Sequence, residues 1–148
     1  MEQRFDVGAL TPDGYKAMFG VHTFVQKSGL PLALLELVRL RVSQINGCAF
    51  CVNMHVPLGR EHGLSEHQIN LAATWREAPV FSARERAALA WAEAVTALAG
   101  QEVPDAVYEQ AKAVFSPEEI AKLTFCVVEI NGWNRLMVAS RTPPQIAA

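Results

Sequence analysis

The chain of 148 residues carries a formal net charge of −2, and 51% of its residues are hydrophobic and 19% charged. This length is typical of one domain with a substantial core, and the composition is that of an ordinary globular protein. No block of like charge is present, so the sequence predicts neither nucleic acid nor an anionic membrane as a partner. We expect a single domain over residues 1–148.

The N-terminal and central segments bear on location. Residues 1–10, MEQRFDVGAL, lack the apolar core of a signal peptide. Residues 42–59 contain no Lys, Arg, Asp or Glu, but their serine, amide, glycine and proline residues argue against a membrane span. Three cysteines are an odd number, which favours redox or metal chemistry over a structural disulfide framework. We therefore expect a cytoplasmic protein.

The first half of the chain predicts three helices after an irregular lead-in over residues 1–10. Thr11-Pro12 opens the first, which Gly29 ends. A second helix follows Pro31, and its many apolar positions indicate burial on most sides. The third runs from about Cys48 to Glu61 and contains Pro57, which is expected to kink or shorten its last turns.

The second half predicts four more helices. Residues 65–68 and 82–85 read as capping boxes, which open one helix towards Trp75 and another through Ala99. Further helices begin at Pro104-Asp105 and at residues 116–119. No stretch alternates between apolar and polar residues with β-branched enrichment, so the predicted fold class is an all-α bundle of about six to seven helices.

The most informative stretch is ELVRLRVSQINGCAFCVNMH, from Glu36 to His55. A CxxC pair at the start of a helix can close a small disulfide ring, and helix N-terminal amides favour a thiolate. Cys51 and His55 are four residues apart, which places a base on the same helical face as a nucleophile. The turn after the preceding helix can bring the Glu36 carboxylate to the imidazole, where it can orient or charge it.

The pattern Glu-x11-Cys-x2-Cys-x3-His, with SQINGCAFCVNMH around it, resembles the alkylhydroperoxidase D family within the carboxymuconolactone decarboxylase-like superfamily. The likeness is strongest over residues 34–62 and extends over most of the chain. It implies an all-α domain with the CxxC pair at the N-terminus of a central helix. The active-site positions of the family fall on four residues: Glu36, Cys48, Cys51 and His55.

The resemblance also implies a cofactor-independent thiol peroxidase. In this mechanism His55, oriented by Glu36, takes the proton of Cys51, and the thiolate attacks a peroxide to form a sulfenic acid. Cys48 then condenses with that acid, and an external dithiol, lipoyl-type or thioredoxin-like, reduces the disulfide. The family implies a homo-oligomer, a trimer or hexamer. Some members have a histidine between the two cysteines, where this chain has Phe50, so any relay through it is absent or rerouted.

Two alternatives remain open. A decarboxylase of the superfamily's other named branch would not require the CxxC pair. A non-catalytic redox sensor or metal-binding module could hold zinc with Cys48, Cys51 and His55, with Glu36 or water as fourth ligand, although the second pair of strong zinc patterns is missing. No Gly-rich phosphate loop is present, so no nucleotide or flavin cofactor is expected.

Several other residues carry weaker expectations. Cys126 lies on an apolar helix and is expected to pack in the core. Without the resemblance, Glu36 would be interpreted as a solvated helix residue paired with Arg39 or Lys27. The remaining histidines are expected at the surface or at helix caps: His22, His62 and His67. Three arginines on apolar helices are expected to pair with a buried carboxylate such as Glu129 or to line a subunit interface: Arg39, Arg41 and Arg135.

Overall fold

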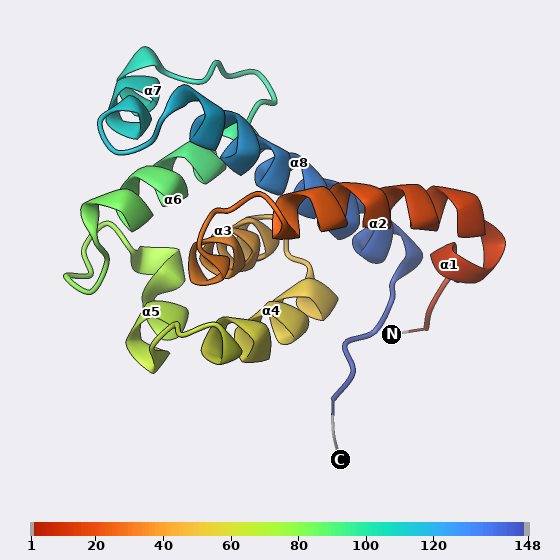
Figure 1. The fold of residues 1–148 in the computed structure, drawn as a ribbon. Helices are drawn as coiled ribbons and strands as arrows, with labels where there is room; N and C mark the ends of the chain where they lie inside the picture. The colour runs from red at the N-terminus through yellow and green to blue at the C-terminus, as the bar shows by residue number, and fades with distance from the viewer. Residues whose placement is uncertain (1, 147–148) are drawn as a thin grey trace.

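A computed structural model describes residues 2–146 of the chain. Within this range the secondary structure is helical and contains no β-strand, which confirms the all-α prediction (Figure 1). The predicted domain, residues 1–148, includes Met1, Ala147 and Ala148, which lie outside the described residues.

The described residues form eight α-helices and one short 3₁₀ helix: α1 (Val7–Leu10), α2 (Pro12–Gln26), α3 (Leu32–Ile45), α4 (Ala49–Glu61), α5 (Glu66–Leu71), η1 (Ala72–Thr74), α6 (Ala83–Thr96), α7 (Asp105–Lys112) and α8 (Pro117–Ser140). The four-residue α1 corrects the prediction of an irregular lead-in. It forms because the Asp6 side chain accepts a hydrogen bond from the Ala9 amide and so caps the first turn.

Serine caps define the starts of three helices. Ser65, Ser82 and Ser116 each accept a hydrogen bond from the backbone amide three residues later, and the Gln or Glu at that position bonds back to the serine amide. The two predicted capping boxes are therefore confirmed. α6 ends at Thr96, earlier than predicted, and α4 continues past Pro57 to Glu61, so the proline does not shorten it.

Helix α3 lies at the centre of the bundle. It packs against α4, α6 and α8, while α2 runs alongside α8 (Figure 1). One face of α3 joins an apolar cluster with α8, and another face joins a second cluster with α5 and α6. Since α3 is covered on most sides, as predicted, three of its polar residues are buried as well: Glu36, Arg39 and Ser43.

The other two arginines on apolar helices differ in their partners. Arg41 donates from Nε to Glu93, a carboxylate of α6, at 2.8 Å. Arg135 is exposed and donates to the backbone and side-chain oxygens of Asn131, so its partner is an amide rather than a carboxylate.

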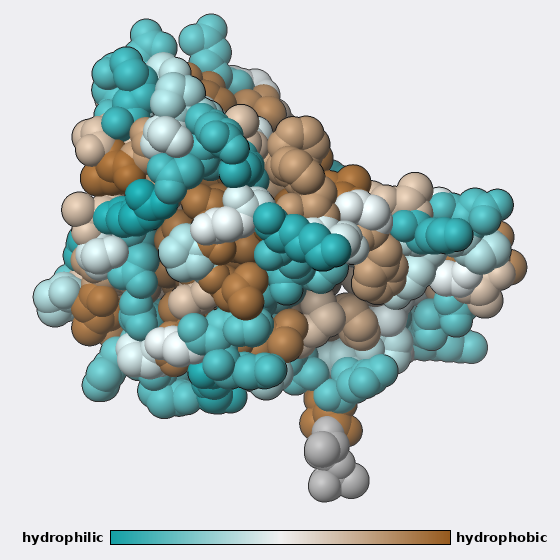
Figure 2. All heavy atoms as spheres, in the orientation of Figure 1, coloured by the Kyte–Doolittle hydropathy of each residue, from teal (hydrophilic) through white to brown (hydrophobic). Residues whose placement is uncertain are grey.

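The surface mixes hydrophobic and hydrophilic side chains, as the face in Figure 2 shows. Two exposed aromatic residues, Phe24 of α2 and Phe125 of α8, pack edge-on with ring centroids 5.1 Å apart, and Val128 is exposed on α8 as well. None of the helices in the described range combines the length and the apolar character that crossing a membrane requires.

Candidate functional site

The two cysteines of the CxxC pair lie at the N-terminus of α4, as predicted. Cys48 is the N-cap residue, and its sulfur accepts a hydrogen bond from the Cys51 amide at 3.3 Å. The two residues form a disulfide with their Cα atoms 5.3 Å apart, and each is 1% exposed. The free amides of a helix N-terminus favour negative charge on a nearby sulfur, so this position favours thiolate chemistry.

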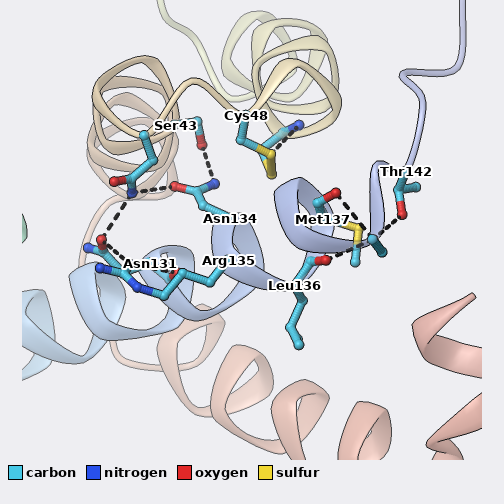
Figure 3. The surroundings of a disulfide bond; sticks show 11 residues. Ser43, Cys48, Asn131, Asn134, Arg135, Leu136, Met137 and Thr142 are labelled. Atoms are coloured by element: carbon cyan, nitrogen blue, oxygen red, sulfur yellow. Dashed lines mark hydrogen bonds between the residues drawn. A yellow bond between two sulfur atoms is a disulfide. The ribbon is translucent and has the colours of Figure 1, made fainter. Parts of the chain in front are cut away.

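The turn between α3 and α4 is anchored to α8. Gly47 has a φ of 66°, a left-handed conformation that glycine adopts without strain, and this lets the chain turn from one helix into the next. The Asn46 side chain donates to Asn131 and Asn134, and Asn134 donates to Ser43 (Figure 3). These contacts hold the start of α4, and therefore the disulfide, against α8.

The structure brings Glu36 and His55 together. His55 Nδ1 lies 2.7 Å from Glu36 Oε2, and both residues are buried, at 3% and 1% exposure. When the imidazole is neutral, Nδ1 donates its proton to the carboxylate and Nε2 is left as an acceptor. Nε2 is buried and has no hydrogen-bond partner among the described residues. The interpretation of Glu36 as a solvated residue is therefore wrong.

Arg39 links this pair to a second one. Its fully buried guanidinium donates to Glu36 Oε1 at 2.6 Å, to Glu129 Oε2 at 3.0 Å and to Gln26 Oε1 at 2.9 Å. On the far side, Glu129 Oε1 lies 2.6 Å from His22 Nδ1. The expected partnership of Arg39 with Glu129 is confirmed. We call the continuous chain of contacts from α4 to α2 the buried array: His55, Glu36, Arg39, Glu129 and His22.

Both carboxylates of the buried array are held in the ionised form. Burial raises the pKa of Glu36, but the hydrogen bond with His55 and the charge of Arg39 outweigh it, so the pKa lies below its usual value. Burial acts in the same way on Glu129, and its hydrogen bond with His22 and the charge of Arg39 again bring the pKa below its usual value.

A cavity of about 300 Å³ lies beside the array. Cys51, His55 and His22 all line it. Its other walls are mostly apolar and include an aromatic group whose neighbouring ring centroids are 5.1–5.3 Å apart: Tyr15, Phe19 and Trp133. Phe50 lines it too. An apolar pocket with a few convergent polar groups is the usual form of a small-molecule site.

The partner cysteine faces elsewhere. Cys48 lines a separate groove between α4 and the C-terminal segment, together with Pro144, Gln145 and Ile146. The Asn53 side chain donates to the Gln145 carbonyl at 2.8 Å and holds that segment in place. Cys51 therefore lines the aromatic cavity, and Cys48 lines the groove beside the C-terminal segment.

The third cysteine packs in the core, as expected. Cys126 is fully buried, and its sulfur lies 3.9 Å from the Leu35 carbonyl oxygen. Burial raises the pKa of its thiol to about 12, so it is protonated at neutral pH and a poor nucleophile. For the zinc alternative, no group of three or more His, Cys, Asp or Glu side chains in the described range is arranged to hold a metal ion.

Comparison with known proteins identifies the fold and the protein family. The fold is alkylhydroperoxidase D-like, and residues 12–94 match the model of the carboxymuconolactone decarboxylase family. The chain belongs to this family.

Relatives cover nearly the whole chain. The uncharacterized protein YdfG of Bacillus subtilis is 34% identical over 139 residues, which are 94% of this chain and 95% of that protein. A structure from Agrobacterium tumefaciens, of unknown function and provisionally described as the antioxidant defence protein AhpD, is 44% identical with a TM-score of 0.96, covering 99% of this chain and all of that one. A peroxidase-related protein from Ralstonia eutropha with an AhpD core shares the fold, at 24% identity and a TM-score of 0.82, over 94% of this chain and 74% of that one.

The sequence did not reveal the second half of the buried array. His22 was expected at the surface or at a cap, but it is one-third exposed and bonds to a buried carboxylate. One signal was available, because His22 falls in the same helical stripe as Tyr15 and Phe19 and is the polar member of that stripe. Its partner Glu129 lies 107 residues away, so no local pattern could pair them.

Replacing Arg39 tests the array as a structural unit. Arg39→Met leaves two buried carboxylates without their shared cation, so we expect it to lower the free energy of unfolding at pH 7 by about 3–5 kcal/mol. Exposed Arg135→Met serves as the matched control and should change it by less than about 0.5 kcal/mol. Urea unfolding measures both.

The effect of Arg39→Met should depend on pH. Because the pKa values of Glu36 and Glu129 are lowered in the folded protein, the stability they contribute is complete above the ordinary glutamate pKa of about 4.3 and is lost as the pH falls below it. In the variant, protonating the carboxylates relieves their repulsion, so its deficit against wild type should shrink between pH 7 and pH 4. An equal deficit at both pH values contradicts the array.

Proposed function

We propose that this protein is a thiol-dependent peroxidase that reduces peroxides through a Cys48–Cys51 dithiol–disulfide cycle, with Glu36 and His55 as its proton relay. The observation that supports the proposal is the buried Nε2 of His55, which has no hydrogen-bond partner among residues 2–146, in a residue that lines the same cavity as Cys51. Thiol activation needs a base with a free nitrogen near the nucleophile and a third group that orients the base. Membership of a family with AhpD-like members supports the same class of activity.

The first half of the cycle oxidises Cys51. His55 Nε2 takes the proton of the Cys51 thiol, and Glu36 stabilises the resulting imidazolium through Nδ1. The thiolate attacks the terminal peroxide oxygen, so an S–O bond forms and the O–O bond breaks. The sulfur becomes a sulfenic acid, and the other oxygen leaves as an alcohol or water once it has gained a proton.

The second half restores the dithiol. The Cys48 thiol attacks the sulfenic sulfur, water leaves, and the disulfide forms; the helix N-terminus favours the Cys48 thiolate that this step needs. An external dithiol, lipoyl-type or thioredoxin-like, then reduces the disulfide and is itself oxidised. The groove beside Cys48 offers this reductant an approach separate from the peroxide cavity. Such a cycle fits the cytoplasm, where dithiol reductants are available.

The alternative function is that of a decarboxylase, the activity for which the family is named. A decarboxylase does not require two thiols, whereas the proposed cycle stops without them. Decarboxylation of a lactone acid that survives replacement of both Cys48 and Cys51 by serine favours that alternative.

We further propose that the protein assembles as a homo-oligomer, as a trimer or hexamer. The exposed aromatic pair Phe24 and Phe125, with Val128 beside it on α8, is an apolar surface that a second subunit can bury. Sedimentation velocity tests this, and a monomer at micromolar concentration contradicts it.

Single cysteine substitutions test the assigned roles. We expect Cys51→Ser to abolish peroxide consumption, because it removes the attacking sulfur. Cys48→Ser should consume one equivalent of peroxide and stop at the sulfenic acid, which a dimedone adduct on Cys51 reports in mass spectrometry. Buried Cys126→Ala is the control and should keep turnover. A single-equivalent reaction in Cys51→Ser instead would reverse the two roles.

Replacing the base tests the relay. In a Cys48→Ser background, His55→Ala should slow Cys51 oxidation by about 100-fold, because general base catalysis typically contributes 10²–10⁴. The same change should move the pH dependence of Cys51 alkylation by iodoacetamide to higher pH, because the thiolate loses its imidazolium partner. The exposed histidine variant His67→Ala is the control. If the alkylation profile does not move, His55 is not the base.

A further inference from the structure

The buried array presents two imidazoles to one cavity, and the proposed cycle uses only one of them. His22 repeats the arrangement of His55: each places Nδ1 on a buried carboxylate, at 2.6 Å and 2.7 Å, and each lines the cavity. The two imidazoles differ in exposure to solvent: the His55 side chain is 4% exposed, and the His22 side chain is 33% exposed. His22 can therefore exchange protons with solvent while it faces the cavity.

The charges of the array favour one bound proton. Two ionised carboxylates and one guanidinium leave a net charge of −1 when both imidazoles are neutral. An uncompensated charge in the protein interior is costly, and one proton on either imidazole makes the array neutral. A second proton would leave it with a net charge of +1. Either imidazole can therefore hold the one proton that makes the array neutral.

We propose that His22, held by Glu129, is a second acid–base residue of this cavity and donates the proton that the departing peroxide oxygen requires. The inference rests on the proposed peroxidase function. Before attack, the proton of the array is on His22, and His55 is neutral and able to accept. The Cys51 thiolate then attacks the peroxide, whose O–O bond breaks, and the departing alkoxide takes the proton of His22 to become an alcohol.

The array ends the step with the charge it had at the start. His55 has gained the thiol proton, and His22 has given its proton to the alkoxide, so the net charge stays at zero and no unpaired charge is created in the core. Solvent then returns a proton to the exposed imidazole as His55 releases its own. The sulfur is oxidised by two electrons, and the peroxide is reduced by two.

The pH dependence of this step involves every titratable group around His22. Six such groups share its cavity: Tyr15 of α2, Glu36 of α3, Cys51, His55 and His62 at α4, and Glu129 of α8. Arg39 adds the permanent positive charge. Because several ionisable groups share the cavity, a pH profile alone does not isolate His22, and the test must depend on the leaving group.

The leaving group separates an acid from a structural residue. tert-Butyl hydroperoxide releases a strongly basic alkoxide that needs a proton, whereas peracetic acid releases acetate, which does not. We expect His22→Gln to lower the rate constant for tert-butyl hydroperoxide by about 100-fold and that for peracetic acid by less than about threefold, since an acid helps only a leaving group that must be protonated. Stopped-flow oxidation of the reduced protein measures both constants.

The ratio of the two constants decides between outcomes. Both come from the same sample, so a partly misfolded variant lowers both and leaves the ratio at the wild-type value. The surface control His67→Gln should leave both constants unchanged. Equal slowing of both peroxides in His22→Gln, or no slowing of either, overturns the role of His22 while the peroxidase function stands. A wild-type protein that reacts with neither peroxide overturns the peroxidase function and this inference with it.

Discussion

The structure depends on one buried cation. The guanidinium of Arg39 is fully buried, and a buried charge is tolerated only where its hydrogen bonds and its charge are satisfied. Its carboxylate partners come from α3 itself and from α8, and each carboxylate holds an imidazole, one on α4 and one on α2. One arginine therefore joins four helices and, through Glu36, helps to fix the His55 ring by its Nδ1.

This constraint relates the core to the chemistry beside it. An aliphatic core would pack α3 equally well, but it would leave His55 free to rotate and to pair with either ring nitrogen. With Nδ1 held by Glu36, the buried Nε2 has no hydrogen-bond partner among the described residues, and His55 lines the same cavity as Cys51. The two cysteines of the disulfide also belong to different hollows. Cys51 lines the aromatic cavity, and Cys48 lines the groove beside the C-terminal segment. In the proposed cycle, this arrangement lets the peroxide and the reductant approach from different sides.

Local chemistry made much of the fold predictable. The serine caps at residues 65 and 82 and the CxxC pair at the start of α4 are short-range patterns, so they could be recognised from neighbouring residues. The association of Glu36 with His55 needed the family resemblance. Pairing Glu129 with His22 needed the packing of α2 on α8, which no sequence window contains. The short α1 was missed because a single aspartate cap and four residues carry little periodicity.

The most direct test is a crystal structure of the reduced protein. With the disulfide open, we expect Cys51 Sγ and His55 Nε2 to lie within about 3.5 Å of each other, the separation of an activated nucleophile and its base, while Nδ1 stays bonded to Glu36. A reduced Cys51 sulfur that points away from the imidazole, or a His55 ring that turns so that Nδ1 leaves the carboxylate, would contradict the proposed relay.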